Sequence, residues 1–226
     1  MSKSTEAISR GIDTSIKNPV LFLPYLAPIL IQLIFTALAY LFPIRYYYFI
    51  EMPNPFINLF GSLIASILGF IAGCMLVDMS NDVISGYQIN IRKSLNLVIG
   101  KIGTLIIAAV IAALCSITII LLPIALFIIV IAIIDKLDAI ESTKRAFDFV
   151  IKNLGEVIIF IIIVIVVGVV FSYGFSLIPI IGPYIGTIIS WLLNVVFTVS
   201  AVYFYLSLRP PPPPPCLLYT SDAADE

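Results

Sequence analysis

The chain has 226 residues, of which 61% are hydrophobic and only 11% are charged, and its net charge is −1. Soluble domains carry about 25% charged residues, so this composition excludes a soluble globular protein and predicts an all-α integral membrane protein with several spans. The absence of histidine removes histidine acid–base catalysis, haem ligation by histidine and most zinc sites, so we expect no cofactor and no metal.

Residues 4–18 are the first element, and their pattern is that of an amphipathic helix at a membrane surface. Ser4 or Thr5 is the expected N-cap. The segment is polar and lacks the apolar core of a cleavable signal peptide. Its charged residues are spaced for interfacial ion pairs along the helix, namely Glu6, Arg10, Asp13 and Lys17.

The first predicted hairpin follows, with spans over residues 20–42 and 57–78. Prolines in the first turns of the earlier span predict a kinked start. Residues 43–56 form a predicted loop, whose aromatic residues suit the headgroup region. In the later span, small residues recur every four positions and predict a helix-packing face, made of Gly61, Ala65, Gly69 and Gly73.

The middle of the chain is predicted to begin with a second interfacial segment, residues 82–103. The apolar run that follows, residues 104–134, is long for one span of about 20 residues and short for two. Lysine and arginine flank it on both sides, which places both flanks in the cytoplasm and requires an even number of crossings. We therefore predict a hairpin that turns near Leu122–Pro123. The alternative is a re-entrant pair that does not fully cross the bilayer.

The clearest amphipathic helix lies at residues 141–155, ESTKRAFDFVIKNLG. Asp138 is its expected N-cap, and Gly155 is its expected end. Its apolar side is expected to face the membrane. Its charged residues are spaced for ion pairs at i,i+4, namely Glu141 with Arg145, Lys144 with Asp148, and Asp148 with Lys152.

The last predicted hairpin has spans over residues 156–177 and 185–207, joined by a tight Pro/Gly turn. In the earlier span, Gly168 and Ser172 continue the small-residue spacing of a helix-packing face. The later span carries one polar face, made of Gly186, Ser190, Asn194 and Thr198. We interpret this polar stripe as a packing seam, with Gln32 as the candidate hydrogen-bond partner of Asn194; a substrate path is the alternative.

No ionisable residue falls at the centre of a predicted span. Asp78, Asp135 and Glu156 lie at span ends, where we interpret them as interface anchors and caps. The sequence shows no phosphate-binding loop, no metal-ligand cluster and no nucleophile–base pair, so we expect no catalytic residues and no enzyme activity.

A repeat relates the amphipathic segments. The pattern E-x3-R-x2-D-x2-I-K-N of residues 6–18 returns 135 positions later in residues 141–153, and a weaker copy lies at residues 91–103. Matches at one fixed offset predict a repeat protein. We expect one polytopic domain over residues 1–209 with pseudo-repeats at about 4–78, 82–135 and 138–209. Each would combine a cytoplasmic-face amphipathic helix with one hairpin, which gives about six transmembrane helices and cytoplasmic N- and C-termini.

The segment 210–226 differs from the rest of the chain. Six prolines precede CLLYTSDAADE, which matches the frame translation of a transposon-type sequencing adapter. We therefore predict that this segment is a disordered artefact of sequencing and leave it out of functional reasoning. The alternative is a polyproline linker with a disordered tail.

Two segments carry a resemblance to a known family, ESTKRAFDFVIKNLGEV at residues 141–157 and SIKNPVLFLPYL at residues 15–26. The arrangement resembles the membrane domains found beside glycerophosphoryl diester phosphodiesterases and related archaeal and bacterial polytopic membrane proteins. The resemblance implies the fold and a prokaryotic membrane location. It does not imply hydrolysis, because the hydrolases of that family use a separate soluble barrel with histidines, which this chain lacks.

Two function hypotheses follow. The first is a non-catalytic integral membrane protein of the cytoplasmic membrane, with a scaffold, lipid-organising or accessory role. Its expected partners are membrane lipids, with anionic headgroups at the cytoplasmic face as candidates and no nucleic acid; the small-residue faces suit homo- or hetero-oligomers as well as contacts within one chain.

The second hypothesis is a small-solute or lipid transporter with a midplane site at the repeat interface. A midplane cavity lined by Gln32, Ser190 and Asn194 would favour the transporter. Tightly packed small-residue seams without a cavity would favour the scaffold. A lipid-modifying enzyme is the weakest alternative, because the sequence offers no catalytic set.

Overall fold

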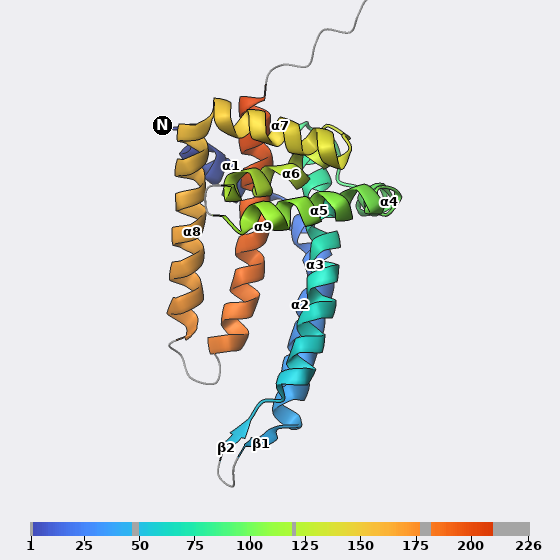
Figure 1. Ribbon diagram of the computed structural model, residues 1–226, viewed down its shortest axis with the longest axis vertical. Helices are drawn as coiled ribbons and strands as arrows, with labels where there is room; N and C mark the ends of the chain where they lie inside the picture. The colour runs from blue at the N-terminus through green and yellow to red at the C-terminus, as the bar shows by residue number, and fades with distance from the viewer. Residues whose placement is uncertain (1, 47–49, 119–120, 177–181, 210–226) are drawn as a thin grey trace, which may run out of the picture.

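The structure is a computed structural model that describes residues 2–46, 50–118, 121–176 and 182–209, and nearly all of this part is helical (Figure 1). The elements of the first half are α1 Lys3–Lys17, a 3-10 turn Pro19–Phe22, α2 Leu23–Leu41, β1 Ile44–Tyr46, β2 Ile50–Met52, α3 Pro55–Ile84 and α4 Ile91–Gly100. The elements of the second half are α5 Ile102–Ser116, α6 Leu122–Ile134, α7 Ala139–Lys152, α8 Leu154–Ser176 and α9 Gly182–Leu208. The segment 210–226 lies outside the described residues.

Two long helical hairpins, α2/α3 and α8/α9, run along the long axis of the molecule (Figure 1). Within the described residues, these four helices are the ones long and apolar enough to cross a membrane singly. The proline-rich start of the first span forms the 3-10 turn, and Pro28 lies inside α2. The second span continues past its predicted end at residue 78, because α3 runs on to Ile84. The architecture therefore contains several apolar helices that are long enough to cross a membrane.

The middle of the chain does not form a third long hairpin. Helices α4 and α5 meet at a bend of 75°, and α5 and α6 have 15 and 13 residues. At 1.5 Å per residue they reach only about 20 Å, against a hydrocarbon core of about 30 Å. Figure 1 shows α5 and α6 lying across the long hairpins. The prediction of six spans in three hairpins is therefore not confirmed: the described residues hold four helices that could cross a membrane, or five such segments if α4 and α5 form one bent span.

Helix boundaries follow local capping, with three differences from prediction. Asp138 caps α7 as expected, since its side chain accepts from the Glu141 N–H. Helix α1 begins earlier than predicted, because Ser2 and not Ser4 or Thr5 is the N-cap. Helix α7 ends at Lys152, so Gly155 lies in the first turn of α8 and does not end the helix. The interfacial segment predicted from residue 82 begins only with α4, which Asn90 caps.

The predicted loop at residues 43–56 contains a short antiparallel ribbon. Strands β1 and β2 pair with Arg45 opposite Glu51 in the register. They lie at the far end of the α2/α3 hairpin (Figure 1). Residues 47–49 of the predicted aromatic belt are outside the described part of the chain.

The amphipathic helices bury mainly small side chains at matching positions and expose many of their large apolar ones. In α1 the buried residues are Ser4, Ala7, Gly11 and Ser15, and in α7 the residues 135 positions later, Ala139, Ser142, Ala146 and Val150, are also buried. Large apolar side chains next to them are exposed, among them Ile16 at 73% and Ile151 at 56%. Small side chains allow close docking to the bundle, and the exposed apolar ones suit contact with lipid.

Each amphipathic helix packs mainly on helices outside the pair that it leads into. Helix α1 packs on α9 and α8, α4 packs on α3, and α7 packs on α6 and α5. At the first of these contacts the backbones come very close: a Cβ placed on Gly11 would lie 2.8 Å from the Cα of Ser200. Glycine is therefore required at residue 11, which sequence spacing alone did not indicate.

A cluster of aromatic rings joins the middle pair to the rest of the bundle. Phe127 of α6 is fully buried, and its ring centroid lies 4.9 Å from that of Phe149 and 5.8 Å from that of Phe204. Phe160 of α8 stacks on Phe204 at 4.9 Å. Helices α6, α7, α8 and α9 thus share one buried core, which holds the short helices in place.

Candidate functional site

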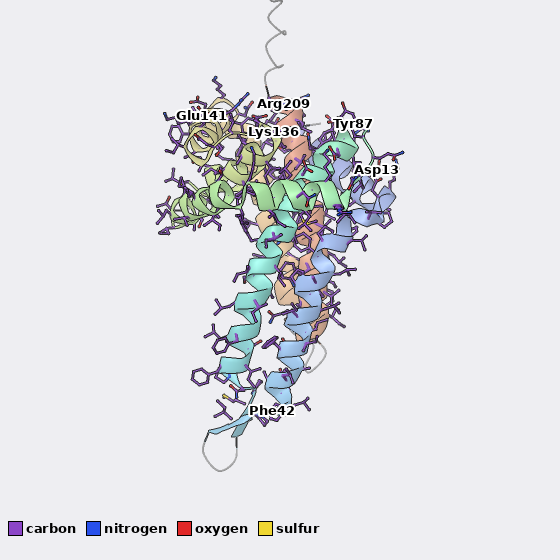
Figure 2. The ribbon with its side chains drawn as sticks, turned by 90° about the vertical axis from the view of Figure 1, so that its right-hand side faces the viewer. Asp13, Phe42, Tyr87, Lys136, Glu141 and Arg209 are labelled. Carbon is purple, nitrogen blue, oxygen red and sulfur yellow. The ribbon has the colours of Figure 1, made fainter. Side chains whose placement is uncertain are left out.

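Charged side chains gather at one end of the molecule, here called the charged end. Figure 2 shows Asp13, Lys136, Glu141 and Arg209 there, and Phe42 at the opposite end. The charged residues of the described chain lie at this end, with the exceptions of Arg45 and Glu51 in the β1/β2 ribbon. They lie in or next to α1, α4 and α7 and at the adjoining ends of α3, α6, α8 and α9. The long helices between the two ends are uncharged.

Asp135 is the centre of an ion cluster at the charged end. It follows α6, and its carboxylate accepts a hydrogen bond of 2.5 Å from the Tyr205 hydroxyl of α9. The Arg145 Nε lies 3.2 Å from one carboxylate oxygen, and an Arg209 guanidinium nitrogen lies 3.5 Å from the other. One carboxylate thus ties α6, α7 and α9 together. Asp135 had been predicted as an interface anchor, and it anchors helices to one another.

Two further acids, at the end of α3, hold α4 in place. Lys93 donates to both oxygens of Asp82, at 2.7 and 2.9 Å. These hydrogen bonds raise the pKa of Lys93 above its usual value. One turn earlier in α3, Asp78 accepts a hydrogen bond of 2.7 Å from the Ser94 hydroxyl. Both aspartates are buried, so these contacts are less screened than surface pairs.

Glu156, the third predicted anchor, holds the start of α1. Its carboxylate accepts from the Ser4 backbone N–H at 3.0 Å and from the Ser4 hydroxyl at 2.6 Å. A carboxylate is favourable at a helix N-terminus, where free N–H groups point outward. The acids at span ends thus dock the amphipathic helices, and this role was not apparent from the sequence.

The predicted i,i+4 ion pairs form only in part. Lys17 and Asp13 are 2.8 Å apart, but both side chains are mostly exposed, so the pair contributes little stability. Arg145 contacts Asp135 and has no ion pair with Glu141 within the described residues. Asp148 likewise has no ion pair with Lys144 or Lys152 within the described residues. Glu6 accepts a hydrogen bond of 3.4 Å from the Tyr203 hydroxyl. Arg145 turns to Asp135 because that carboxylate is nearly buried, whereas Glu141 faces solvent.

A cavity of about 480 Å³ lies where α2, α3, α6, α8 and α9 meet. Its walls are largely apolar, with Phe70, Leu126, Phe160 and Phe197 among the lining residues, and no lining residue is charged. Helix α6 lies on the side of the charged end (Figure 1), and the cavity is not fully enclosed, since Ser190 and Asn194 of its wall are exposed. Its volume is within the range of roughly 300–1,000 Å³ that ligand pockets occupy.

The predicted polar stripe of α9 lines this cavity. Ser190, Asn194 and Thr198 all belong to its wall. The Thr198 hydroxyl donates a hydrogen bond of 2.8 Å to the Asn194 backbone oxygen, and the buried Tyr25 belongs to the same wall. The carboxamide of Asn194 has no hydrogen-bond partner among the residues that the structure describes. These three residues border an open space, so the interpretation of this face as a packing seam is not confirmed.

Gln32 does not meet Asn194. Its side-chain nitrogen lies 3.4 Å from both the Thr36 hydroxyl and the Asn58 side-chain oxygen, between α2 and α3. It is absent from the cavity wall. The expectation that Gln32 pairs with Asn194 is wrong, because α2 presents Tyr25, and not Gln32, to α9.

The predicted helix-packing residues divide into two groups. On α3, Gly61 abuts Phe35, Gly69 abuts Trp191 and Gly73 abuts Tyr25, and Ala65 is buried. On α8, a Cβ placed on Gly168 would meet nothing within 4 Å, because Gly168 borders the cavity. The Ser172 side chain lies outside the described residues.

Sequence reasoning missed most of the cavity wall. Tyr25 and Cys74 supply polar atoms to it, and Gly168 leaves space in it. Nothing in their spacing relates three residues on three separate helices. Among the described residues, no group of three Cys, Asp or Glu side chains is arranged to hold a metal ion.

Comparison with known proteins adds no relative to these observations. No family model matches the chain, and no curated protein and no solved structure matches it. The resemblance to the phosphodiesterase-associated membrane domains stays a prediction.

Proposed function

We propose that this protein is a non-catalytic integral membrane protein of the cytoplasmic membrane that organises lipids at the inner leaflet. The observation that carries the proposal is the division of the molecule into a charged end, covered by α1, α4 and α7, and long uncharged helices. Such amphipathic helices lie in the headgroup region with their apolar side chains among the acyl chains.

The distribution of lysine and arginine supports a cytoplasmic charged end. Of the twelve basic residues of the chain, Arg45 alone lies at the opposite end, in the β1/β2 ribbon. Cytoplasmic segments are enriched in lysine and arginine. Both ends of the described chain, Ser2 and Arg209, belong to the charged end, which is the basis for proposing cytoplasmic N- and C-termini.

The packing of the surface helices supports an approximately threefold plan. The same offsets are buried in α1 and α7, and Ser94 and Val98 of α4 occupy the corresponding positions of the weaker copy. Helix α1 docks on the last hairpin, α4 on the first and α7 on the middle pair. Each of the three predicted repeats thus places its surface helix on another repeat, and the three contacts form a closed cycle. We propose three repeats, of which the middle one has a re-entrant pair in place of a spanning hairpin.

Basic side chains on the surface helices are the candidate contacts for anionic headgroups. Arg10, Arg92, Lys144 and Lys152 have no ion pair within the described residues, and each lies on α1, α4 or α7. Each basic residue near an anionic surface contributes roughly 1 kcal/mol of attraction. Lys17 and Lys93 are already paired and are the natural comparison.

Orientation is tested by single cysteine substitutions in inverted and right-side-out vesicles. Lys101→Cys and Lys144→Cys are expected to react with an impermeant thiol reagent from the cytoplasmic side, and Phe42→Cys from the other. The substitutions are made in a Cys216→Ser background, because, of the two other cysteines of the chain, Cys74 is buried and Cys115 is half-buried. This background without a further substitution is the control. Labelling of Lys101→Cys and Lys144→Cys from opposite sides would contradict the topology and the threefold plan.

The lipid role is tested by thermal unfolding in nanodiscs with and without anionic lipid. The variant Lys144→Gln/Lys152→Gln is expected to lose most of the stabilisation that anionic lipid gives. Lys17→Gln is the matched control on an already paired lysine and is expected to keep it. Equal behaviour of the two variants would count against headgroup binding by these residues.

A second function, transport of a lipid or small solute, is favoured by the cavity beside Asn194. Reconstituted protein would then move a fluorescent lipid between leaflets, and Asn194→Leu would slow that movement, whereas Gln32→Leu would not. Absence of movement with the unsubstituted protein would exclude this candidate and leave the first proposal intact.

A further inference from the structure

The centre of α9 contains a polar group that the described part of the chain does not satisfy. At 1.5 Å per residue, Asn194 lies about 18 Å from the start of α9 and about 21 Å from its end. The residue therefore falls near the middle of a membrane in any orientation close to the normal. An unsatisfied amide is costly in hydrocarbon, because no water is available to hydrogen-bond it. The position calls for a partner that is not among the described residues.

The surroundings of Asn194 restrict what that partner is. The cavity wall has no charged residue, so an ionised headgroup would be buried without a counter-charge. The polar atoms of the wall come from Ser190, Thr198, Tyr25 and Cys74 besides Asn194, and the remaining lining is mainly Phe, Leu, Ile and Val. A water molecule requires two to four polar partners, so water suits the part of the cavity beside these residues, whereas the larger apolar part calls for an apolar occupant.

We infer that the cavity binds a neutral amphiphile, with an apolar chain along α3, α6 and α8 and an uncharged hydrogen-bonding head on the Asn194 carboxamide. A carboxamide both donates and accepts, so it pairs with a hydroxyl or a protonated carboxyl group. The chain fills an apolar space of about 480 Å³, which Gly168 keeps open. The occupant enters from the bilayer, where such molecules are dissolved, through the open side of the cavity.

This inference rests on the membrane location proposed above and is independent of the role of the surface helices. The probe is a long-chain alcohol that carries a photoreactive diazirine, used in nanodiscs of zwitterionic lipid. An alkane with the same diazirine but no hydroxyl is the matched ligand. Labelled residues are identified by mass spectrometry of the digested protein. Because no anionic lipid is present, failure here is separate from failure of headgroup binding.

The alcohol is expected to label residues of α3, α8 and α9 that line the cavity, and an excess of unlabelled alcohol is expected to reduce the labelling. Asn194→Leu is expected to weaken alcohol binding by about three- to tenfold, which corresponds to one buried hydrogen bond, and to leave alkane binding unchanged. Gln32→Leu, which removes a polar group outside the cavity, is expected to change neither.

Gly168→Leu fills the cavity without touching Asn194. A Cβ at this position meets nothing within 4 Å, so the variant is expected to fold and to lose binding of both alcohol and alkane by about tenfold. It keeps the test decisive should Asn194→Leu fail to fold. Equal alcohol labelling of all variants, or labelling confined to the outer surface, would overturn the inference.

A second copy of the chain is the competing partner for Asn194, since polar residues also join helices across a membrane. An Asn194→Cys variant in a Cys216→Ser background distinguishes the two. Ready formation of a disulfide-linked dimer in nanodiscs, with no competition by the alcohol, would overturn the amphiphile site. Monomeric Asn194→Cys that is protected from a thiol reagent by the alcohol would support it.

Discussion

The two long hairpins and the short middle pair are all made mainly of apolar residues, yet they serve the fold differently. Helices α2/α3 and α8/α9 reach from one end of the molecule to the other, whereas α5 and α6 stop after about 20 Å and lie across the bundle. Because the middle pair is short, it cannot cover the facing sides of α3 and α8 along their length. The cavity forms in the space beside α6 that a full-length hairpin would fill.

The largest expected effect comes from removing the aromatic ring of Phe127, which holds the short pair α5 and α6 against the long hairpins. Phe127→Ala is expected to lower the free energy of unfolding by about 3–5 kcal/mol, because Phe127 is fully buried among rings of α7, α8 and α9. Unfolding by SDS in mixed micelles measures the loss. Phe171→Ala is the control on an exposed ring of α8 and is expected to cost less than about 1 kcal/mol. Equal losses would mean that α6 is not held by this cluster.

Tight packing within a long hairpin predicts the next largest effect. A Cβ at Gly61 would lie 2.2 Å from the Cβ of Phe35, which is too close for α2 and α3 to keep their separation. Gly61→Ala is therefore expected to destabilise by about 1–3 kcal/mol, despite the higher helix propensity of alanine. The same SDS titration measures it. A neutral or stabilising outcome would show that the two helices are further apart than described.

The ion cluster at the charged end predicts an effect of about 1–3 kcal/mol. Asp135→Asn removes the charge that Arg145, Arg209 and Tyr205 share, and it leaves two guanidinium groups close together. Thermal unfolding in detergent is the measurement. Asp13→Asn is the control on an exposed pair and is expected to change stability by less than about 1 kcal/mol. A larger effect for Asp13→Asn would contradict the assignment of Asp135 as the joining residue.

The open space beside the middle pair predicts the smallest effect, and one of opposite sign. Gly168→Ala places a methyl group where nothing lies within 4 Å, so the gain in helix propensity is not offset by a clash. The variant is expected to be more stable by about 0.5–1 kcal/mol. With Gly61→Ala it forms a pair in which the same substitution has opposite results. Destabilisation by Gly168→Ala would show that this face of α8 is covered.

The contacts that assemble the charged end were predicted only in part. The sequence indicated the amphipathic helices and the acids at the span ends, since both follow from local spacing. It also suggested that Arg145 pairs with Glu141, its neighbour on the helix surface. The structure pairs Arg145 with Asp135 because a carboxylate that is 10% exposed attracts a cation more strongly than one that water screens.

The site was also predicted only in part. The face with Ser190, Asn194 and Thr198 belongs to one helix, so the four-residue spacing in the sequence was enough to predict it. The choice between seam and cavity depends on what α3, α6 and α8 place opposite that face, and these helices are far apart in sequence. Gln32 was a reasonable partner for Asn194 by depth, but the rotation of α2 about its axis presents Tyr25 to α9 instead.

By itself, the sequence determined a helical membrane protein with its charges at helix ends and with surface helices of two faces, because burial of apolar residues and backbone hydrogen bonding act locally along each helix. The tertiary structure alone decided that the middle apolar run lies across the bundle and that an open space borders Asn194. An apolar run of about 31 residues removes its side chains from water whether it forms a spanning hairpin or lies across the bundle. Only the packing of side chains between helices decides between these two arrangements.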